Sequence, residues 1–349
     1  MKVIMIGSHL RVNGGITRVV KNYFEAGLDN KVQLEYFPTY YGMNHFINIL
    51  FYIIQYFKFS LKLFIFKEKF DVAHIHMSYK GSFTRKRLFI NLLNAKKVPI
   101  ILHMHGSQFK DFFGKGSEAK KRQITETLNK VNVIIALGRE WKEYYESICN
   151  SRVLSLDNAV FPKKINNNQE KVYITTMGVL SKRKGTYDLV EVASKVKGKI
   201  DRKYKFLLAG DGEIENVKKV IKEKNVEDMF VIPGWISDEN KIEGIYLKSI
   251  VYVLPSYNEG MPMSILEAMS YGLPIISTNV GSINSVVKDD NGYIVNPGDT
   301  EALAQRLLEI LNNPQNWGKY QENNSKEVES KYNIYNSIEN LKLIYQSLI

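Results

Sequence analysis

The chain has 349 residues, which is enough for two domains of ordinary size. Its single cysteine, Cys149, excludes a disulfide framework within the chain and fits a reducing compartment. The formal net charge is +12, and the whole excess lies in residues 1–160, which hold 24 Lys and Arg against 12 Asp and Glu. One-sided basic charge predicts an acidic partner, such as nucleic acid, a phospholipid surface or a phosphorylated molecule.

Apolar runs alternate with helical stretches along the whole chain, and most of these runs are uninterrupted, as is typical of parallel strands covered on both faces. The repeated βαβ pattern predicts an α/β protein with two doubly wound sheets. The polar segment 161–170 predicts a linker, and the last helix is expected over 333–348. Residues 1–7 form too short an apolar run for a signal peptide and predict a first strand, which favours a cytoplasmic protein. The other predicted strands are Leu34–Phe37, Val72–Ile75, Ile100–His103, Val133–Ala136, Ile174–Gly178, Phe206–Ala209, Val231–Pro233, Val251–Leu254 and Ile275–Ser277.

A glycine pair, Gly14-Gly15, follows the first strand and opens a helix. Two glycines let the backbone approach a ligand closely, and the N-terminus of a helix suits a phosphate group. The pair lacks the G-x-G-x-x-G spacing, so a dinucleotide-binding site is poorly supported, and a plain strand-to-helix turn stays open as an alternative.

An aromatic-rich helix is expected over residues 46–66. Its uncharged run, 46–57, is too short to span a bilayer. Polar residues recur every seven positions and form one narrow stripe on this helix, at Asn48, Gln55, Lys62 and Lys69. Two interpretations stay open: an internal helix packed on the N-terminal sheet, or an interfacial helix that dips into lipid while its lysines meet anionic headgroups.

Four of the six histidines form two pairs near the ends of predicted strands, His74-Ile-His76 and His103-Met-His105. Alternate residues of a strand point the same way, so two such pairs on adjacent strands could hold zinc. No cysteine or carboxylate pair completes the set of ligands. Histidines held by hydrogen bonds to the backbone are the favoured interpretation for His74 and His103, while His76 stays undecided.

A basic turn, Lys182-Arg183-Lys184, follows the first strand of the second half and precedes Gly185. Further on, Gly210 lies in a Gly-Asp-Gly turn, and the segment Ile232–Trp235 closes the next strand. Each loop alone is a weak signal, because glycine turns of this kind are common.

The most informative segment is 259–267, which follows the buried strand ending at Leu254. It places Glu259 and Glu267 around a turn, with Pro262 in the first turn of a helix expected over 263–271. Free backbone N–H groups at a helix N-terminus form an anion site suited to a diphosphate, and carboxylates beside it can accept hydrogen bonds from sugar hydroxyls.

This E-x7-E segment, with Lys184-Gly185 before it, resembles the motifs of retaining, nucleotide-sugar-dependent glycosyltransferases of family four. The resemblance implies the GT-B fold: two doubly wound, Rossmann-like domains facing a central cleft, with a C-terminal helix that returns to the N-domain. The expected ranges are 1–163 for the acceptor-binding domain, 170–330 for the donor-binding domain and 331–349 for the returning helix. The chain departs from the family at Val179, where an arginine is usual; Arg183 is a candidate to replace it.

The resemblance also implies roles for the site residues. Glu259 is expected to hold the hexose hydroxyls and Glu267 the ribose hydroxyls. Lys184, Arg183 and His105 are expected to complete the catalytic group with Glu259. The expected donor-binding residues are Gly14, Gly15, Lys184, Gly210, Ile232, Trp235, Glu259, Gly260, Met261, Pro262, Met263, Ser264 and Glu267.

The expected activity is transfer of a hexose or N-acetylhexosamine, with retention, from a nucleotide sugar to a lipid-linked glycan at the membrane, in surface polysaccharide synthesis. A UDP-sugar is favoured as co-substrate. No cofactor or metal is expected, because the chain has no Asp-x-Asp and cationic side chains can take the part of magnesium. The protein is expected at the inner face of the cytoplasmic membrane. A nucleotide-sugar epimerase of the same architecture and a zinc-dependent hydrolase remain alternatives, while no nucleic-acid module is recognised.

Overall fold

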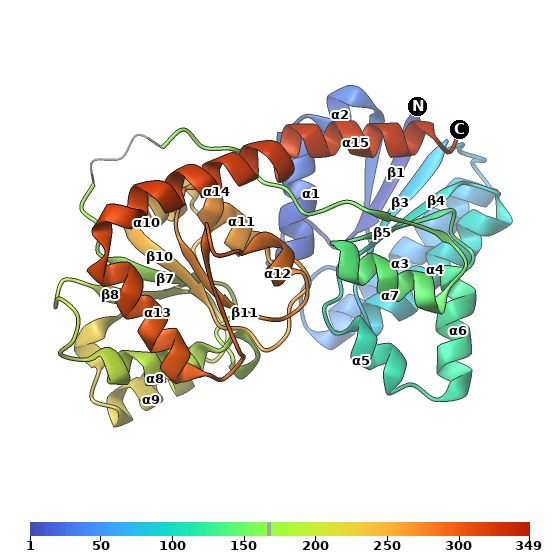
Figure 1. Cartoon of the computed structure of the whole chain (residues 1–349). Helices are drawn as coiled ribbons and strands as arrows, with labels where there is room; N and C mark the ends of the chain where they lie inside the picture. The colour runs from blue at the N-terminus through green and yellow to red at the C-terminus, as the bar shows by residue number, and fades with distance from the viewer. Residues whose placement is uncertain (166–168) are drawn as a thin grey trace. The chain divides into compact units, whose positions relative to one another are not determined.

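The computed structural model describes residues 1–165 and 169–349 and divides into two compact units. Unit 1 joins Met1–Ala159 to the C-terminal segment Ile334–Ile349, and unit 2 is the continuous segment Val160–Asn333. The predicted linker 161–170 falls at the start of unit 2, although its residues 166–168 lie outside the described residues. Each unit has its own parallel sheet, with helices along it (Figure 1).

The sheet of unit 1 has the strand order β2-β1-β3-β4-β5-β6, and every pairing is parallel. Strands β3, β4 and β5 are buried along their whole length, which explains their uninterrupted apolar sequence. The strands are β1 (Lys2–Gly7), β2 (Gln33–Pro38), β3 (Val72–Met77), β4 (Ile100–Met104), β5 (Val133–Ala136) and β6 (Arg152–Ser155).

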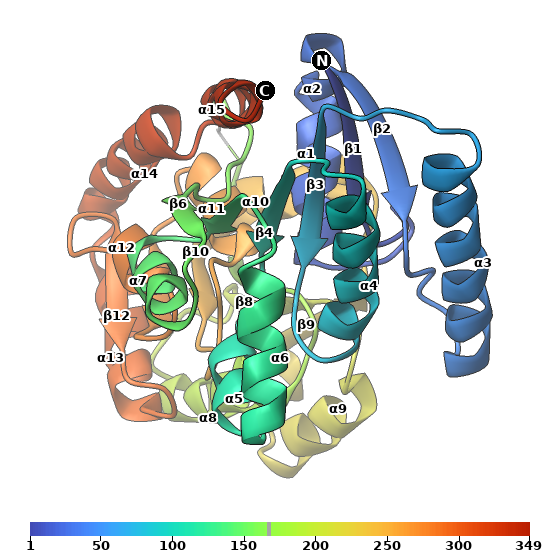
Figure 2. The same ribbon diagram turned by 90° about the vertical axis from the view of Figure 1, so that its right-hand side faces the viewer.

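The helices of unit 1 cover this sheet, and α3, which lies beside α4, packs against the core of the unit with its buried side chains Phe59 and Leu63 (Figure 2). They are α1 (Gly15–Glu25), α2 (Leu28–Lys31), α3 (His45–Phe64), α4 (Gly81–Ala95), α5 (Phe109–Gly114), α6 (Glu118–Leu128), α7 (Arg139–Ile148) and α15 (Ile334–Gln346). The last helix, α15, lies against α1, and its Tyr345 hydroxyl is 2.7 Å from Nδ1 of His74 on β3. A segment distant in sequence therefore completes the core of unit 1.

The sheet of unit 2 has the order β12-β11-β10-β7-β8-β9, again with parallel pairing throughout. Its strands are β7 (Tyr173–Met177), β8 (Lys205–Ala209), β9 (Phe230–Gly234), β10 (Ser249–Leu254), β11 (Ile275–Thr278) and β12 (Gly292–Val295). The chain winds from β7 through β8 to β9 and then returns to the other side of β7 with β10. The boundary between β7 and β10 is thus a topological switch point, where ligands of doubly wound sheets bind.

Helices and short 3₁₀ turns connect these strands. They are η1 (Lys182–Lys184), α8 (Thr186–Val196), α9 (Ile214–Glu223), η2 (Glu227–Met229), α10 (Glu239–Lys248), α11 (Met263–Ser270), α12 (Ile283–Val286), α13 (Thr300–Asn312), η3 (Pro314–Asn316) and α14 (Trp317–Lys331). Side chains from α8, α9 and α13 pack with the central strands in one apolar core.

The α/β prediction with two doubly wound sheets is confirmed, and all ten predicted strands overlap observed ones. Two strands were missed, β6 and β12, which lie at sheet edges and are only partly buried. The internal-helix interpretation of residues 46–66 holds for one narrow face only, because Phe59 and Leu63 are the only buried side chains of α3.

Candidate active site

Two cations and one carboxylate meet where β7 and β10 end. The Lys184 ammonium donates to Oε1 of Glu259 at 2.5 Å, and Nη1 of Arg183 lies 3.9 Å from the same oxygen. The side chain of Glu259 is 8% exposed and that of Lys184 is 15% exposed, so solvent screens this pair only weakly. The two cations are donors that suit a bound anion, although the Glu259 carboxylate offsets part of their charge.

Hydrogen bonds to backbone groups hold the lysine loop, residues 181–185, against the loop that follows β10, residues 255–259. The guanidinium of Arg183 donates to the carbonyl of Asn258 at 2.8 Å, and the Tyr257 amide donates to the carbonyl of Arg183, also at 2.8 Å. Between them, Gly185 has φ +69° and its Cα faces the Pro255 carbonyl, so an added Cβ would lie 2.0 Å from that oxygen. The Lys-Gly pair in the sequence thus has a steric reason: only glycine lets the lysine loop lie this close to the loop after β10.

Glu259 is held from two further sides. The Ser256 hydroxyl donates to its Oε1 at 2.8 Å. Behind it, Gly281 has φ +54°, and an added Cβ there would lie 2.1 Å from the Glu259 carbonyl oxygen. The Ser282 amide then donates to the Gly260 carbonyl at 2.9 Å. The carboxylate therefore has a fixed position before any ligand arrives.

Helix α11 begins directly after this carboxylate. It spans Met263–Ser270, close to the predicted 263–271, but Pro262 occupies the N-cap position with φ −72° and ψ 124° rather than the first helical turn. The backbone N–H groups of Met263 and Ser264 lie in the first turn, where an α-helix offers them no internal acceptor. Gly260 and Met261 complete the loop between Glu259 and the helix. The helix dipole adds partial positive charge at this point.

Sequence analysis missed a tyrosine in this site. Tyr252 lies within the apolar run of β10, and its hydroxyl donates to the Met177 carbonyl at 3.1 Å, at the end of β7. Burial raises the pKa of Tyr252, and the carboxylates of Glu267 and Glu259 raise it further. Its hydroxyl thus lies in the field of both motif glutamates, of which Glu267 is half-buried on α11. An apolar strand with one tyrosine gives no sequence signal for such a role.

The predicted nucleotide-base loops lie next to β7 along the sheet. Gly210 follows β8, and its amide donates to the Gly234 carbonyl at 2.9 Å, while an added Cβ would lie 1.7 Å from the Gly178 carbonyl oxygen. Ile232 lies within β9 and is half-buried, and Trp235 follows this strand with 42% of its surface exposed. These loops, the lysine loop and α11 follow strands of the same sheet at their carboxyl ends.

The other predicted residues, Gly14, Gly15 and His105, lie in unit 1. Gly14 is the N-cap of α1 with φ 149°, and Gly15 is its first residue. No atom of residues 1–165 and 169–349 lies within 4 Å of a Cβ added at either glycine, so the backbone here faces open space. His105 follows β4 and donates to or accepts from Nδ1 of His76 on β3 at 2.9 Å. Both loops lie at the carboxyl edge of the sheet of unit 1.

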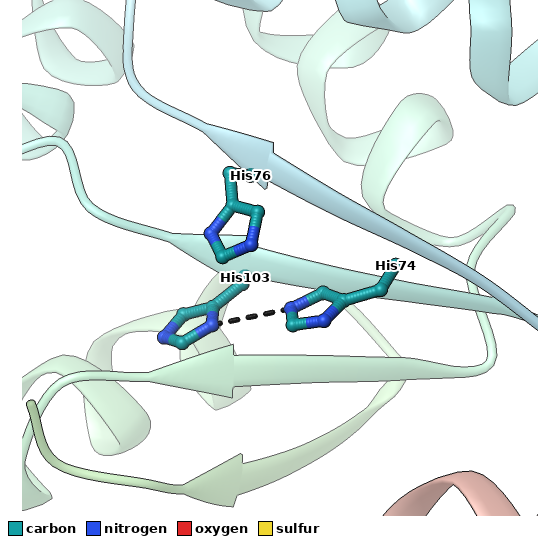
Figure 3. A group of neighbouring side chains, drawn as sticks. All are labelled: His74, His76 and His103. Carbon is teal, nitrogen blue, oxygen red and sulfur yellow. Dashed lines mark hydrogen bonds between the residues drawn. The ribbon is translucent and has the colours of Figure 1, made fainter. Parts of the chain in front are cut away.

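The histidine pairs form one buried cluster, and Figure 3 shows the rings of His74, His76 and His103 converging between β3 and β4. The Tyr345 hydroxyl bonds one ring nitrogen of His74, and His103 lies 3.3 Å from the other. Burial lowers the pKa of His74 to about 3 and that of His105 to about 3, so these imidazoles are neutral at physiological pH. Neutral, stacked rings of this kind fill the core.

The same cluster meets one requirement of a metal site, because ring nitrogens of His74, His76 and His103 lie within 4.8 Å of one another. Both nitrogens of His74 already have hydrogen-bond partners, however. These contacts favour a structural role for His74, but the predicted hydrogen bonds to the backbone are wrong, because its partners are the side chains of Tyr345 and His103. The buried Nε2 of His103 has no hydrogen-bond partner among the described residues. His76 pairs with His105 and shares its environment.

Comparisons with known proteins agree with this architecture. Residues 157–328 match the family model described as "Glycosyl transferases group 1", and residues 14–160 match "Glycosyltransferase Family 4". A Klebsiella pneumoniae relative, an uncharacterized 41.2 kDa protein in the cps region, is 30% identical over 72% of each chain. An Escherichia coli relative, UDP-Gal:alpha-D-GlcNAc-diphosphoundecaprenol alpha-1,3-galactosyltransferase, is 25% identical over 83% of this chain and 79% of its own length.

Solved structures show the same fold. Sucrose-phosphate synthase from Thermosynechococcus elongatus superposes with a TM-score of 0.81 at 16% identity and covers 99% of this chain and 98% of its own. Anabaena HepE in complex with UDP gives a TM-score of 0.80 at 13% identity, over 99% and 100% of the two chains.

Two doubly wound units of this kind define the GT-B class of glycosyltransferases. Within that class, the chain belongs to glycosyltransferase family 4, as the family models and the relatives show. Membership of this family argues against both alternatives that the sequence left open, the epimerase and the zinc-dependent hydrolase.

Proposed function

We propose that this protein is a retaining, metal-independent glycosyltransferase that moves a hexose or N-acetylhexosamine from a UDP-sugar to a lipid-linked glycan during surface polysaccharide synthesis. The observation that carries the proposal is the cluster of Lys184, Arg183 and Glu259 beside the N-terminus of α11, at the switch point of the second sheet.

Charge and geometry support a nucleotide diphosphate at this cluster. Lys184 and Arg183 supply cationic donors that suit a diphosphate, although the carboxylates of Glu259 and Glu267 offset their charge. The N–H groups opening α11 add further donors. Glu259 would then accept from hexose hydroxyls and Glu267 from ribose hydroxyls. The loops at Gly210, Ile232 and Trp235 would hold the base. Relatives with UDP in their names or titles favour uridine.

Catalysis then consists of stabilising the leaving diphosphate. As the bond between the anomeric carbon and the phosphate oxygen breaks, negative charge develops on UDP, and Lys184, Arg183 and the backbone N–H groups at Gly14 and Gly15 would stabilise it. The acceptor hydroxyl attacks from the same face and transfers its proton to the departing phosphate oxygen. His105, neutral at physiological pH, orients the sugar by hydrogen bonding rather than by charge.

The names of relatives support the acceptor assignment. One acts on a diphosphoundecaprenol-linked sugar, and others belong to amylovoran and capsular polysaccharide biosynthesis. Such acceptors lie at a membrane. Two features of unit 1 suit binding to a membrane surface: the charge excess of residues 1–160 and the apolar helix α3.

The 12-residue uncharged run is too short to span a bilayer, but the whole of α3 is long and apolar enough to cross a membrane by length and composition alone. Because Phe59 and Leu63 belong to the core of unit 1, we place α3 in the lipid interface rather than across the bilayer. The protein would then be cytoplasmic and peripherally bound.

The donor assignment is tested by thermal unfolding with UDP-, GDP- and ADP-sugars. A bound ligand at 100 times its dissociation constant adds about 2.7 kcal/mol to the free energy of unfolding. We expect the largest rise in melting temperature with a UDP-sugar, unchanged by chelator. If no nucleotide sugar raises it, the proposal is wrong. Inversion of the anomeric carbon in the product, seen by NMR, would contradict retention.

A further inference from the structure

The predicted polar stripe included Lys69, but α3 ends at Phe64 and Lys69 is exposed beyond it. Asn48 and Lys62 of the stripe face the protein, which is the reverse of an ordinary surface helix. The Asn48 side chain accepts from the Gly42 amide at 3.0 Å, and Lys62 pairs with Glu35 at 3.0 Å and with Glu68 at 2.5 Å. The opposite face is apolar and exposed, with Phe46 75% and Phe57 64% exposed. The other exposed apolar residues of α3 are Ile49, Leu50, Ile53, Ile54, Leu61 and Phe64.

A pocket of about 320 Å³ opens at the N-terminal end of this face. Tyr40, Asn48, Tyr52 and Arg85 are among its lining residues, although most of the pocket wall is apolar. Ile49 lines it too and also belongs to the exposed apolar face. Its volume falls in the range of small-molecule sites, about 300–1,000 Å³. The pocket and the apolar face therefore form one continuous surface.

Arg85 is the charged group of this pocket, and it has no carboxylate partner among the described residues. Its guanidinium lies 4.8 Å from the Tyr40 ring centroid, and its buried Nε has no hydrogen-bond partner in that part of the chain. Burial lowers the pKa of Arg85, as expected for a charge held without a counterion.

The neighbours of Arg85 lack acidic partners too. Lys86 is 1% exposed and donates only to the Ser82 hydroxyl, at 3.2 Å. Neither Arg87 nor Lys120 forms an ion pair with a described carboxylate, whereas several other lysines of unit 1 do, among them Lys2, Lys31 and Lys110. Within the pocket itself, Arg85 therefore supplies a positive charge that no described carboxylate balances, which suits an anion from outside the chain.

We propose that this pocket binds the phosphate group of the lipid-linked acceptor, with the lipid chain lying along the exposed face of α3. Arg85 offers a planar fork of donors that matches phosphate oxygens, and the Tyr40 hydroxyl can add a further bond, while the Tyr52 hydroxyl already donates to the Arg85 carbonyl at 3.3 Å. Ile49 begins the apolar path that continues to Phe57. The inference rests on the proposed function, since it assigns a place to the acceptor.

The experiment titrates farnesyl diphosphate, a soluble isoprenoid diphosphate, into the full chain and follows tyrosine and tryptophan fluorescence. Farnesol and inorganic pyrophosphate supply the chain and the anion separately, and we expect each to bind at least about tenfold more weakly. Arg85→Gln should weaken farnesyl diphosphate binding by about tenfold or more, which corresponds to about 1.4 kcal/mol. Arg85→Lys, which keeps the charge but not the fork, should give an intermediate loss.

The matched control is Arg122→Gln, which removes the same charge from an exposed position on α6. Equal affinity of the Arg85→Gln and Arg122→Gln proteins for farnesyl diphosphate would overturn the inference. Binding of short-chain phosphatidylglycerol with the same dependence on Arg85 would also overturn it, because the pocket would then accept phospholipids in general. Stabilisation by a UDP-sugar is measured on the same samples, so a failure of the donor assignment is seen separately.

Discussion

Lys184 and Glu259 are the two side chains whose removal should be most informative. Because Glu259 is nearly buried, Lys184→Met leaves a carboxylate without its main partner and removes a cation from the leaving group. We expect kcat to fall by about 100-fold, or about 2.7 kcal/mol of transition-state stabilisation. Steady-state kinetics with a UDP-sugar and an acceptor measures this.

Lys182→Met is the control for that change, since Lys182 belongs to the same 3₁₀ turn but is exposed. It should retain near-normal kcat. A similar loss in both proteins would show that the basic turn acts only through its overall charge.

The buried histidines make the stability of unit 1 depend on pH. The folded-state pKa of His74 is about 3, below the unfolded value of about 6.5, so the unfolded chain binds more protons as the pH falls below 6.5. The contribution of His74 to stability is therefore complete above pH 6.5 and is lost at about 1.4 kcal/mol per pH unit below it. Denaturation of the His74→Gln protein should show a shallower slope between pH 6.5 and pH 4.5. The exposed His45 supplies the control variant, and equal slopes in the His74→Gln and wild-type proteins would refute the assignment.

The turn between η1 and α8 depends on one glycine. A matched pair of variants separates its two requirements, a positive φ angle and the absence of a Cβ. Gly185 and Gly198 have similar positive φ angles, +69° and +76°, but only at Gly185 would a Cβ meet backbone, 2.0 Å from the Pro255 oxygen. Gly198→Ala should cost about 1 kcal/mol from backbone strain alone. Gly185→Ala should cost more and lower activity, because the lysine loop must move. Equal free energies of unfolding for the two variants would contradict this account.

Helix α3 has two faces with opposite expected responses to mutation. Leu50→Gln with Phe57→Gln should reduce sedimentation with vesicles while leaving the melting temperature nearly unchanged, because both side chains are exposed. Leu63→Ala should instead destabilise the fold by about 2–5 kcal/mol, since Leu63 lies in the core. A large loss of stability in the Leu50/Phe57 variant would mean that this face packs against protein.

The elements show what sequence could predict. Central strands such as β3 are buried on both faces and leave an uninterrupted apolar run, so they were found. The edge strands β6 and β12 are partly exposed, and their mixed sequences carry no such signal. The stripe on α3 was found from its spacing, but its direction was not. That direction depends on Glu35 and on the loop around Gly42, which fold against the helix from elsewhere in the chain.

The site was predictable to a similar degree. Glu259, Lys184 and Gly185 were found because they lie in short motifs, and the structure brings them together. Tyr252 was missed, since its hydroxyl meets Met177 only after β7 and β10 pair. The basic run Arg85-Lys86-Arg87 lies on helix α4, and its sequence gave no hint that Lys86 is buried.

At the scale of the whole molecule, the charge asymmetry of the chain predicts how it meets a membrane. All of the net charge of +12 lies in residues 1–160, so binding to vesicles that contain phosphatidylglycerol should weaken between about 0.1 M and 1 M salt, as the Debye length falls from about 10 Å to about 3 Å. Binding to phosphatidylcholine vesicles should be weaker and nearly independent of salt. Flotation assays measure both, and equal salt dependence for the two lipids would refute an electrostatic contribution.

Unit 1 is assembled from two pieces of chain, and this has a consequence for synthesis on the ribosome. Translation at about 5–20 residues per second delivers Ile334 roughly 10–35 s after Ala159. Until then α1 lacks its contacts with α15, and the His74 ring lacks its hydrogen bond to Tyr345. Unit 2, in contrast, is one continuous segment and can fold as soon as it leaves the ribosome. The nascent protein should therefore finish its second half first, and stalling a ribosome just before Ile334 should leave the early half open to proteases.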